Sequence, residues 1–387
     1  MSKEKRRVPK LRFPGFTEDW EQCKLGSLAS VEMNKRIFKE QTTTNGDIPF
    51  YKIGTFGSDA DSFISRELFE EYKNKYPYPN IGDILISASG SIGRTVVYNG
   101  EDAYFQDSNI VWLNHNGKID NSFLLQFYNQ VKWAGLEGST IKRLYNKNIL
   151  ETNIALPKIE EQRLIGKFFT LVDSTITLHQ RKLEHLNLKK KALLQKLFPK
   201  NGECYPELRF PGFTDAWEQR KLSEITTCFD NLRVPVTTSD RVSGKTPYYG
   251  ANGIQDYVSG NTHSGEFVLI AEDGANDLND YPVQYVNGEI WVNNHAHVIA
   301  GFKEKLDNKF LSYALKTVKM TTFIVGSGRS KLNLKALLEI PISMPNYNEQ
   351  CFVGKFIDKI DTNITLHQRK LDHLQLQKKA LLQQMFV

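Results

Sequence analysis

Two stretches of this chain occur twice, almost unchanged. Leu11–Leu25 reads LRFPGFTEDWEQCKL, and Leu208–Leu222 reads LRFPGFTDAWEQRKL. A longer stretch, EQRLIGKFFTLVDSTITLHQRKLEHLNLKKKALLQKLF at Glu161–Phe198, returns at Glu349–Phe386 with most of its positions identical. The segments between these repeats resemble each other only weakly. The period is far too long for a solenoid, whose repeats span about 20 to 50 residues. The chain therefore predicts two related units with pseudo-two-fold symmetry, the single-chain counterpart of a symmetric dimer.

The alignment of the two copies predicts six segments. They are an N-terminal segment, a first insert, a repeated helix, a repeated lead, a second insert and a C-terminal repeated helix, at residues 1–23, 24–158, 159–200, 201–220, 221–346 and 347–387. The inserts contain strand-like runs, such as DILISAS in the first and EIWVNNHAHVIA in the second, separated by glycine and asparagine turns. Each insert also has one helical stretch, near 122–134 and 308–322. Both inserts are therefore predicted to be α+β domains.

The longer repeats carry the apolar pattern of a coiled coil, with apolar residues at steps of three, four or their sums. A helix of about 38 residues is about 57 Å long and cannot bury such a stripe alone. Two copies related by a two-fold axis across the helices run antiparallel, so we expect an antiparallel helix pair. The alternative is that each helix packs on its own insert. The residues expected to form the pair, or to dock partner proteins on it, are Leu164, Phe168, Ile176, Leu183, Leu186, Leu193, Phe352, Phe356, Ile364, Leu371, Leu374 and Leu381.

Polar residues interrupt both stripes at equivalent positions. They are His179 and Lys190 in the first helix and His367 and Lys378 in the second. If the central leucines meet at the middle of the pair, His179 faces Lys378 and Lys190 faces His367. Polar residues in a helix seam can fix its register at a cost in stability. The alternative is that both lysines extend outward into water.

Composition sets broad limits on the function. The chain has 387 residues, a formal net charge of +6 and four scattered cysteines without a CxxC pair. No apolar run is long enough to span a bilayer, and the basic N-terminus is not followed by the apolar core of a signal peptide. We therefore expect a soluble cytoplasmic protein with reduced thiols. The mild positive charge permits a nucleic-acid partner without establishing one.

Motifs of catalysis are missing from the sequence. Gly244-Lys245-Thr246 resembles the end of a P-loop, but Ser239 stands where the first glycine is required. The sequence contains no GxSxG, HExxH or zinc-finger spacing. His295 and His297 are the best metal candidate, because residues two apart in a strand share a face, and Glu272–Asp273 could complete the site. The neighbouring Asn293–Asn294 favours the alternative, a polar surface that hydrogen-bonds a ligand.

Basic residues recur after a turn of small residues near the end of each insert. Lys142, Arg143 and Lys147 follow Gly138-Ser139, and Arg329, Lys331 and Lys335 follow Gly326-Ser327-Gly328. Such a turn leading into a short basic helix suits phosphate contact, and arginine is the commonest reader of guanine edges. The alternative is a solvated charged surface, which the recurrence in two different inserts makes less favourable.

The order and spacing of these motifs resemble the specificity (S) subunit of Type I restriction–modification systems, over essentially the whole chain. The motifs are the LRFPGF leads, GDILISASGSIG at Gly82–Gly93, PYYGANGIQDYV at Pro247–Val258, LIAEDGA at Leu269–Ala275, WVNNHAHVIAG at Trp291–Gly301 and the EQ-containing leads into the long helices. The resemblance implies two target-recognition domains that each read half of a split DNA site, separated by the antiparallel helices. It also implies no catalysis and no cofactor in this chain. Two modification subunits would methylate adenine with S-adenosylmethionine, and restriction subunits would use ATP and Mg²⁺.

On this reading, the expected DNA contacts lie in the glycine turn of the first insert, in the duplicated basic loops and in the polar segments of the second insert. They are Ser89, Ser91, Arg94, Ser139, Lys142, Arg143, Lys147, Tyr249, Asn252, Asn293, Asn294, His295, His297, Ser327, Arg329, Lys331 and Lys335. Because the inserts differ, the two half-sites are expected to differ. Two other functions stay open: a coiled-coil adaptor that does not touch DNA, and a self-sufficient DNA-modifying enzyme.

Overall fold

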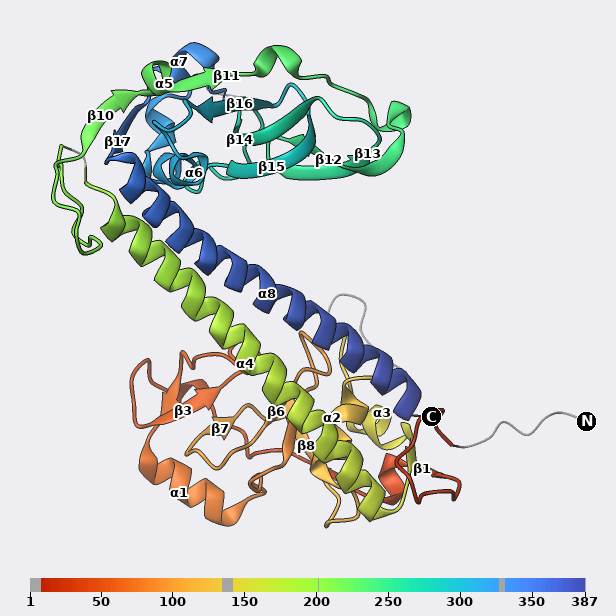
Figure 1. Cartoon of the computed structure of the whole chain (residues 1–387). Helices are drawn as coiled ribbons and strands as arrows, with labels where there is room; N and C mark the ends of the chain where they lie inside the picture. The colour runs from red at the N-terminus through yellow and green to blue at the C-terminus, as the bar shows by residue number, and fades with distance from the viewer. Residues whose placement is uncertain (1–7, 134–141, 201, 327–330, 387) are drawn as a thin grey trace, which may run out of the picture. The chain divides into compact units, whose positions relative to one another are not determined.

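The chain forms two compact units that share its two long helices. The computed structural model describes residues 8–133, 142–200, 202–326 and 331–386. The first unit comprises residues 1–179 and 370–387, and the second comprises residues 180–369. Each unit therefore contains one insert, part of α4 (Ile159–Leu197) and part of α8 (Tyr347–Met385) (Figure 1). These boundaries cut across both helices, whereas the segments defined from the sequence follow the helix ends.

In the first unit, three small sheets and three helices build the insert. The sheets have the orders β1-β9, β2-β8-β5-β6 and β4-β3-β7. Their strands are β1 (Glu21–Lys24), β2 (Ser30–Glu32), β3 (Ile48–Tyr51), β4 (Phe63–Ile64), β5 (Ile84–Ser87), β6 (Thr95–Val97), β7 (Tyr104–Phe105), β8 (Ile110–Asn114) and β9 (Asn153–Leu156). The helices are α1 (Arg66–Lys75), α2 (Asn121–Tyr128) and α3 (Asn146–Leu150).

In the second unit, a two-stranded and a six-stranded sheet accompany three short helices. The sheet orders are β10-β17 and β11-β16-β14-β15-β12-β13. The strands are β10 (Glu218–Lys221), β11 (Thr226–Cys228), β12 (Ser243–Gly250), β13 (Gly253–Val258), β14 (His263–Ala271), β15 (Val283–Val292), β16 (Ala296–Gly301) and β17 (Pro341–Met344). The helices are α5 (Leu222–Ile225), α6 (Asn308–Thr317) and α7 (Leu334–Leu338).

The two inserts share a strand frame that their sequences conceal. The order β2-β8-β5-β6 in the first unit has the same connectivity as β11-β16-β14-β15 in the second. In both, the central strand pairs antiparallel with its neighbours: β5 with β6 and β8, and β14 with β15 and β16. The predicted α+β class is confirmed, and the two weakly similar inserts are copies of one architecture.

Two local predictions were wrong. The run EIWVNNHAHVIA is not one strand, because the chain turns between β15 and β16 at residues 293–295. The first insert also contains α1, which the sequence analysis missed, although Leu68, Phe69 and Tyr72 form a short apolar face that packs on the core of this unit. Its start did carry a signal, since Ser65 accepts a hydrogen bond from the N–H of Leu68 as an N-cap and an acidic residue follows.

The repeated leads are explained by a buried ion pair in each unit. Arg12 of the first LRFPGF donates two hydrogen bonds to Glu161, with distances of 2.7 and 2.8 Å from Nε and Nη2. Arg209 of the second makes the same pair with Glu349 at 2.8 and 2.7 Å. Both carboxylates are essentially inaccessible to water. The lead of each insert is therefore fastened to the first turn of the long helix that follows the insert.

Aromatic packing closes the same junction. The indole of Trp20 packs edge-on against Phe123 of α2 and Phe386, which follows α8. The equivalent rings in the second unit are Trp217, Phe310 of α6 and Phe198, which follows α4. These clusters anchor the C-terminal end of one long helix in the core of each unit.

Antiparallel pairing of α4 and α8 is evident from one ion pair in each unit. Lys378 Nζ lies 2.6 Å from Asp173 Oδ1 in the first unit, and Lys190 Nζ lies 2.6 Å from Asp361 Oδ1 in the second. The step from Asp173 to Lys190 is 17 residues forward along α4, and that from Lys378 to Asp361 is 17 residues backward along α8. The predicted antiparallel pair is confirmed.

The predicted partners of the seam lysines were wrong. Both ion pairs that the structure gives these lysines are with aspartates, and each aspartate lies six residues from the histidine that we expected. The outward orientation is also incorrect, because the lysine side chains are only 19% exposed. Sequence spacing had fixed which face of each helix meets the other, but the lengthwise offset depends on where the inserts hold the helix ends.

Candidate nucleic-acid interface

A glycine turn follows the central strand of the first unit. The backbone N–H of Gly93 donates to the Ser87 carbonyl at 2.9 Å, and the Ser87 hydroxyl donates to the Ser91 carbonyl. Gly90 and Gly93 have φ values of +62° and +82°, which side-chain-bearing residues adopt only at a steric cost. The turn exposes Ser91 and Arg94, two of the predicted contacts, at its surface.

The basic segment of the first unit lies against this turn. Ser89 and Arg143 form an isolated antiparallel bridge, and the N–H of Leu144 donates to the Ala88 carbonyl at 2.8 Å. The Ser89 hydroxyl donates to Asn109 Oδ1 at 2.7 Å, and Arg143 Nη2 donates to the same oxygen at 3.3 Å. Two separate predicted segments are thus brought together around Asn109, which the sequence analysis did not single out.

The second unit repeats this arrangement with different side chains. Asp273 and Lys331 form the isolated bridge, and the N–H of Leu332 donates to the Glu272 carbonyl at 2.7 Å. Nδ1 of His295 lies 2.5 Å from Asp273 Oδ1, so that nitrogen donates to the carboxylate. The register of β14 with β16 and of β5 with β8 aligns these residues with those of the first unit.

We call these groups the strand-end clusters. The first consists of Ser89, Asn109 and Arg143, and the second of Asp273, His295 and Lys331. Each gathers residues from the end of a central strand, from the start of its neighbour and from the chain just before α3 or α7. Three further predicted DNA contacts, Ser139, Ser327 and Arg329, lie outside the described residues.

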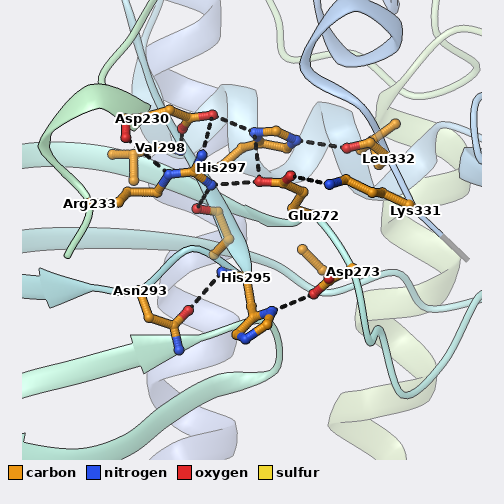
Figure 2. A network of polar contacts seen from close by, with 12 residues as sticks. Asp230, Arg233, Glu272, Asp273, Asn293, His295, His297, Val298, Lys331 and Leu332 are labelled. Atoms are coloured by element: carbon orange, nitrogen blue, oxygen red, sulfur yellow. Dashed lines mark hydrogen bonds and ion pairs between the residues drawn. The ribbon is translucent and has the colours of Figure 1, made fainter. Parts of the chain in front are cut away.

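A charged network supports the second strand-end cluster from inside the protein (Figure 2). Arg233 Nη1 lies 2.7 Å from Glu272 Oε2 and its Nη2 lies 3.2 Å from Asp230 Oδ2. Lys331 Nζ lies 2.9 Å from Glu272 Oε1. His297 is buried between two acceptors, Asp230 Oδ2 at 2.6 Å and the Leu332 carbonyl at 2.7 Å from its two ring nitrogens. This geometry fits an imidazolium that donates from both nitrogens.

The network lowers the pKa values of its two carboxyl groups. Burial by itself would raise the pKa of Asp230, but hydrogen bonds from His297 and from the N–H of Val298, together with the charge of Arg233, leave it below the ordinary value. For Glu272, burial is likewise outweighed by hydrogen bonds from Arg233 and Lys331, and its pKa is lowered. Both carboxylates are therefore ionised and paired at neutral pH.

The two histidines do not form the metal site considered from the sequence. His295 lies in the turn, bonded to Asp273, whereas His297 lies in β16 and bonds to Asp230, so the two imidazoles face different carboxylates (Figure 2). Asp230, Glu272 and His297 do place potential ligand atoms within 4.8 Å of one another. Arg233 and Lys331 already neutralise both carboxylates, so this group fits a structural ion network. The prediction that His297 contacts DNA is wrong, because the side chain is buried and both ring nitrogens are occupied.

The remaining predicted contacts of the second unit lie around its strand-end cluster. The N–H of Asn293 donates to the Tyr249 carbonyl at 3.1 Å, and the side chain of Asn293 is buried. Asn252 is exposed and holds the loop after β14, donating to the Gly274 carbonyl at 2.9 Å and accepting from the N–H of Asn276 at 3.0 Å. Asn294 is exposed at the turn. Of these, Asn252 and Asn294 are accessible to a ligand, whereas Asn293 shapes the turn.

The basic residues outside the strand-end clusters are accessible and make few contacts with the rest of the protein. Lys142 is exposed, and the Arg94 guanidinium donates to the Gly57 carbonyl at 3.1 Å. Lys147 lies on α3, 4.0 Å from Glu151, and Lys335 lies on α7. Both helices are five residues long, so the expected helix N-terminus for phosphate is a single turn with a weak dipole.

The apolar residues expected on the long helices divide into two groups. Leu183, Leu186 and Leu371 are buried, with exposed fractions of 7 to 9%. Leu164 and Phe352, at equivalent positions, are 43% and 59% exposed. The others are half-buried: Phe168, Ile176, Leu193, Phe356, Ile364, Leu374 and Leu381. In the described residues, none of the helices is long and apolar enough to cross a membrane.

Comparison with known proteins gives a consistent family assignment. The family described as "Type I restriction modification DNA specificity domain" matches residues 17–188 and 214–376. A putative type I restriction enzyme specificity subunit of Haemophilus influenzae, S.HindORF215P, is 55% identical over 155 residues, which cover 39% of this chain and 40% of that protein. The putative MjaX specificity subunit of Methanocaldococcus jannaschii is 25% identical over 94% of this chain and 92% of its own length. The crystal structure of a type I S subunit from M. genitalium covers 98% of this chain and 99% of its own, with a TM-score of 0.73 at 17% identity, and therefore supports the fold.

Proposed function

The chain belongs to the family of Type I restriction–modification DNA specificity proteins, and on this premise we propose that its two units read the two halves of one asymmetric, bipartite DNA site. The observation that carries the proposal is the pair of strand-end clusters. They occupy the same place in one shared strand frame and differ in every side chain. A duplicated frame with different edges is suited to hold two readers for two different half-sites.

The chemistry of the two clusters differs in a way that base recognition can use. The first presents an amide and a guanidinium, groups that bind purine edges in the major groove, whereas the predicted contact Ser89 is buried and its hydroxyl holds the amide of Asn109. The second presents a carboxylate-bound imidazole and an ammonium, which combine an acceptor of cytosine or adenine amino groups with phosphate-binding charge. We propose Asn109 and Arg143 as readers in the first unit, and His295 and Asp273 in the second. Lys142 and Lys335 would bind phosphates and so position the duplex.

The antiparallel helices would act as the spacer between the half-sites. Two readers that bind one face of a duplex need half-sites separated by about one helical turn, roughly 34–36 Å. In this proposal the helix pair, tied by one ion pair within each unit, would set that distance. The proposed target therefore contains unread bases between two specified parts.

The exposed apolar residues of the helices would dock the modification subunits. Leu164, Leu171 and Leu178 follow one another at seven-residue intervals on α4 and are 43, 60 and 66% exposed. Residues at this interval lie on one face of a helix, and such a stripe is unfavourable in water. We propose that this stripe, and Phe352 and Leu366 on α8, bind two modification subunits. Methylation with S-adenosylmethionine, and cleavage with ATP and Mg²⁺, would belong to partner subunits, so that this chain binds no cofactor and is not an enzyme.

An exchange of one insert tests the proposal. Residues 221–346 are replaced by the corresponding insert of another family member, and methylated adenines are sequenced in cells that carry the hybrid with its modification subunit. We expect one half of the methylated site to change and the other to persist. A change in both halves would contradict the assignment of one half-site to each unit.

Binding and activity assays on the purified chain separate the other two functions. A gel shift across a salt series distinguishes a DNA reader from an adaptor, since phosphate contacts make affinity fall steeply with salt. Incubation with DNA and Mg²⁺, or with S-adenosylmethionine, tests for an enzyme. Methylation or cleavage by the chain alone would show that it is self-sufficient.

A further inference from the structure

A basic cleft of about 1210 Å³ lies in the second unit, outside the strand-end cluster. It is lined by the C-terminal part of α4, by the end of α6 with the segment after it, and by the loop between β14 and β15. The lysines in its lining are Lys190, Lys191, Lys196, Lys200, Lys316 and Lys319, and the carboxylates are Glu207, Asp277 and Asp280. Six lysines against three carboxylates leave the lining with a net charge of +3.

Half of these lysines already have partners. Lys196 and Lys200 lie 2.7 and 3.8 Å from the carboxylate of Glu207, and Lys190 is paired with Asp361 at 2.6 Å. Among the described residues, Lys191, Lys316 and Lys319 make no ion pair. The unneutralised charge of the cleft is therefore concentrated on α4 and on the end of α6, which face each other across it.

Lys316 is in an unfavourable position without a ligand. Its side chain is half-buried at the end of α6, and no hydrogen bond to its ammonium is found among the described residues. Burial lowers the pKa of Lys316 and the charge of Lys190 lowers it further, while Asp280 and Asp361 oppose these effects. A half-buried cation beside a second cation is stabilised by a bound anion.

The first unit provides an internal comparison. The backbone N–H of Asp120 donates to Gln162 Oε1, and that of Asp307 donates to the equivalent Gln350 Oε1. This match aligns α2 with α6, so that Asn129 corresponds to Lys316. The first unit has the corresponding cleft, lined by Asn129, Gln130 and α8 residues that include Lys378 and Lys379, but its volume is only about 400 Å³. The cleft of the second unit is therefore larger than that of the first, and it has a lysine where the first unit has an asparagine.

Two segments of the cleft lining run on along the chain to residues of the proposed reading surface. The lining residue Asp277 lies three residues after Gly274. The carbonyl of Gly274 accepts a hydrogen bond from Asn252. On the other side, Phe323 lies two residues before Val325, which forms a bridge with Lys331 of the strand-end cluster. The carboxylate of Asp277 accepts from the N–H groups of its own turn, and Glu207 is neutralised by two lysines, so neither opposes an incoming anion strongly.

We propose that this cleft binds backbone phosphates of the DNA next to the half-site read by the second unit, with Lys316 and Lys191 as the contacting residues. The inference rests on the proposed function. It adds a second surface that contacts DNA independently of the base sequence. Flexible lysines around an open cleft suit a run of phosphates, whereas a small phosphate ligand is usually held by converging backbone N–H groups or arginine forks. The asymmetry implies that the second unit binds the duplex with more phosphate contacts than the first.

The test combines lysine variants with neutral phosphates. The full chain, with its modification subunit, is titrated with a cognate duplex in a salt series, and single phosphates are replaced by methylphosphonates across the second half-site and its flanks. We expect Lys316→Asn, which restores the residue of the first unit, and Lys191→Gln each to reduce the salt slope by about 0.9. In the wild-type complex, a methylphosphonate at a contacted phosphate should weaken DNA binding. Each variant should abolish this loss of affinity at one or two particular phosphates, while the DNA sequence that the complex methylates stays the same.

Matched variants serve as controls. Lys182→Gln removes an equal charge from an exposed position of α4 outside the cleft and should leave the phosphate pattern unchanged. Asn129→Lys should increase the salt slope through the first unit. Thermal unfolding identifies a misfolded Lys316→Asn protein, and the exposed Lys191→Gln then decides the question by itself.

The outcomes distinguish this inference from the proposed function. If the wild-type complex shows no salt-dependent binding to the cognate duplex, the proposed function itself fails. If it binds, but both lysine variants keep the wild-type slope and phosphate pattern, only the cleft assignment is overturned. Loss of the modification subunit on purification, without a change in slope, would show that an acidic protein surface occupies the cleft and would also overturn it.

Discussion

The two strand-end clusters differ in chemistry although the same frame presents them. Ser89, Asn109 and Arg143 meet through neutral hydrogen bonds and one guanidinium in the first unit. Their counterparts in the second unit form a carboxylate–imidazole pair beside a lysine that is itself tied to Glu272. The strand order, the arginine–glutamate pair and the tryptophan cluster below them are the same. The shared core contacts hold the fold in both units, so under the proposed function the edge residues are free to vary with the half-site that each unit reads.

The units also differ in how the edge is supported. The second cluster rests on four largely buried ionisable side chains, those of Asp230, Arg233, Glu272 and His297, whereas the first rests mainly on backbone bonds and on the turn around Gly90 and Gly93. A buried ion network contributes little net stability but is strongly destabilised when one member is removed. Substitutions at the second edge should therefore affect folding more than substitutions at the first.

The largest expected effect tests the shared frame. Arg12→Ala and Arg209→Ala should each destabilise their own unit by about 3–5 kcal/mol, because each leaves a buried glutamate without its partner. Hydrogen exchange resolved along the chain reports each unit separately during denaturation. Lys158→Ala, which removes an exposed pair with Glu18, is the control and should cost less than about 1 kcal/mol. Destabilisation by only one of the two arginine substitutions would contradict the structural equivalence of the two units.

A second test concerns the helix pair. Leu186 is 9% exposed, whereas its equivalent Leu374 is only half-buried. Leu186→Ala should therefore cost roughly 2–4 kcal/mol, and Leu374→Ala a clearly smaller amount, measured as the free energy of unfolding in denaturant. Equal losses at both positions would mean that the helices bury the same face along their whole length.

A third test separates the two readers. Arg143→Ala should weaken binding of the cognate duplex by about 1–3 kcal/mol and relax specificity only in the half-site of the first unit. His295→Ala should do the same for the other half-site. Lys142→Ala is the comparison, since loss of a phosphate contact should weaken cognate and scrambled duplexes alike and reduce the salt slope by about one. Relaxed specificity in both half-sites from either variant would contradict independent reading.

The smallest expected effect concerns acid. The pKa values of Asp230 and Glu272 are lowered in the folded chain, so their contribution to stability is present above their ordinary pKa values and is lost as pH falls through the lowered ones. Arg233, His297 and Lys331 are the side chains that face these carboxylates. Hydrogen exchange below about pH 4 should show the second edge opening before the first. Simultaneous opening would mean that the ion network does not distinguish the units.

Much of the architecture could be predicted because the sequence contains two copies of the same segments. The heptad pattern identified both long helices and their antiparallel pairing, and the alternation of apolar runs and turns identified most of the central strands. The helix α1 was missed because its apolar face is short, with Leu68, Phe69 and Tyr72 among charged residues. The lengthwise register of the helix pair was predicted wrongly, because Lys190 and Lys378 pair with aspartates. Which residues become neighbours depends on where each insert holds the helix ends.

By itself, the sequence determined the two-fold plan of this protein, its helix spacer and the segments that carry its polar loops, since periodicity and duplication are properties of the chain. Only the tertiary structure decided which of those polar residues meet. It brought Asn109 to Ser89 and Arg143, buried His297 between Asp230 and the Leu332 carbonyl, and left Lys316 half-buried in a cleft with no ion pair among the described residues. The physical reason is that burial and pairing arise where strands distant in sequence end side by side, and no local pattern specifies which ends become neighbours.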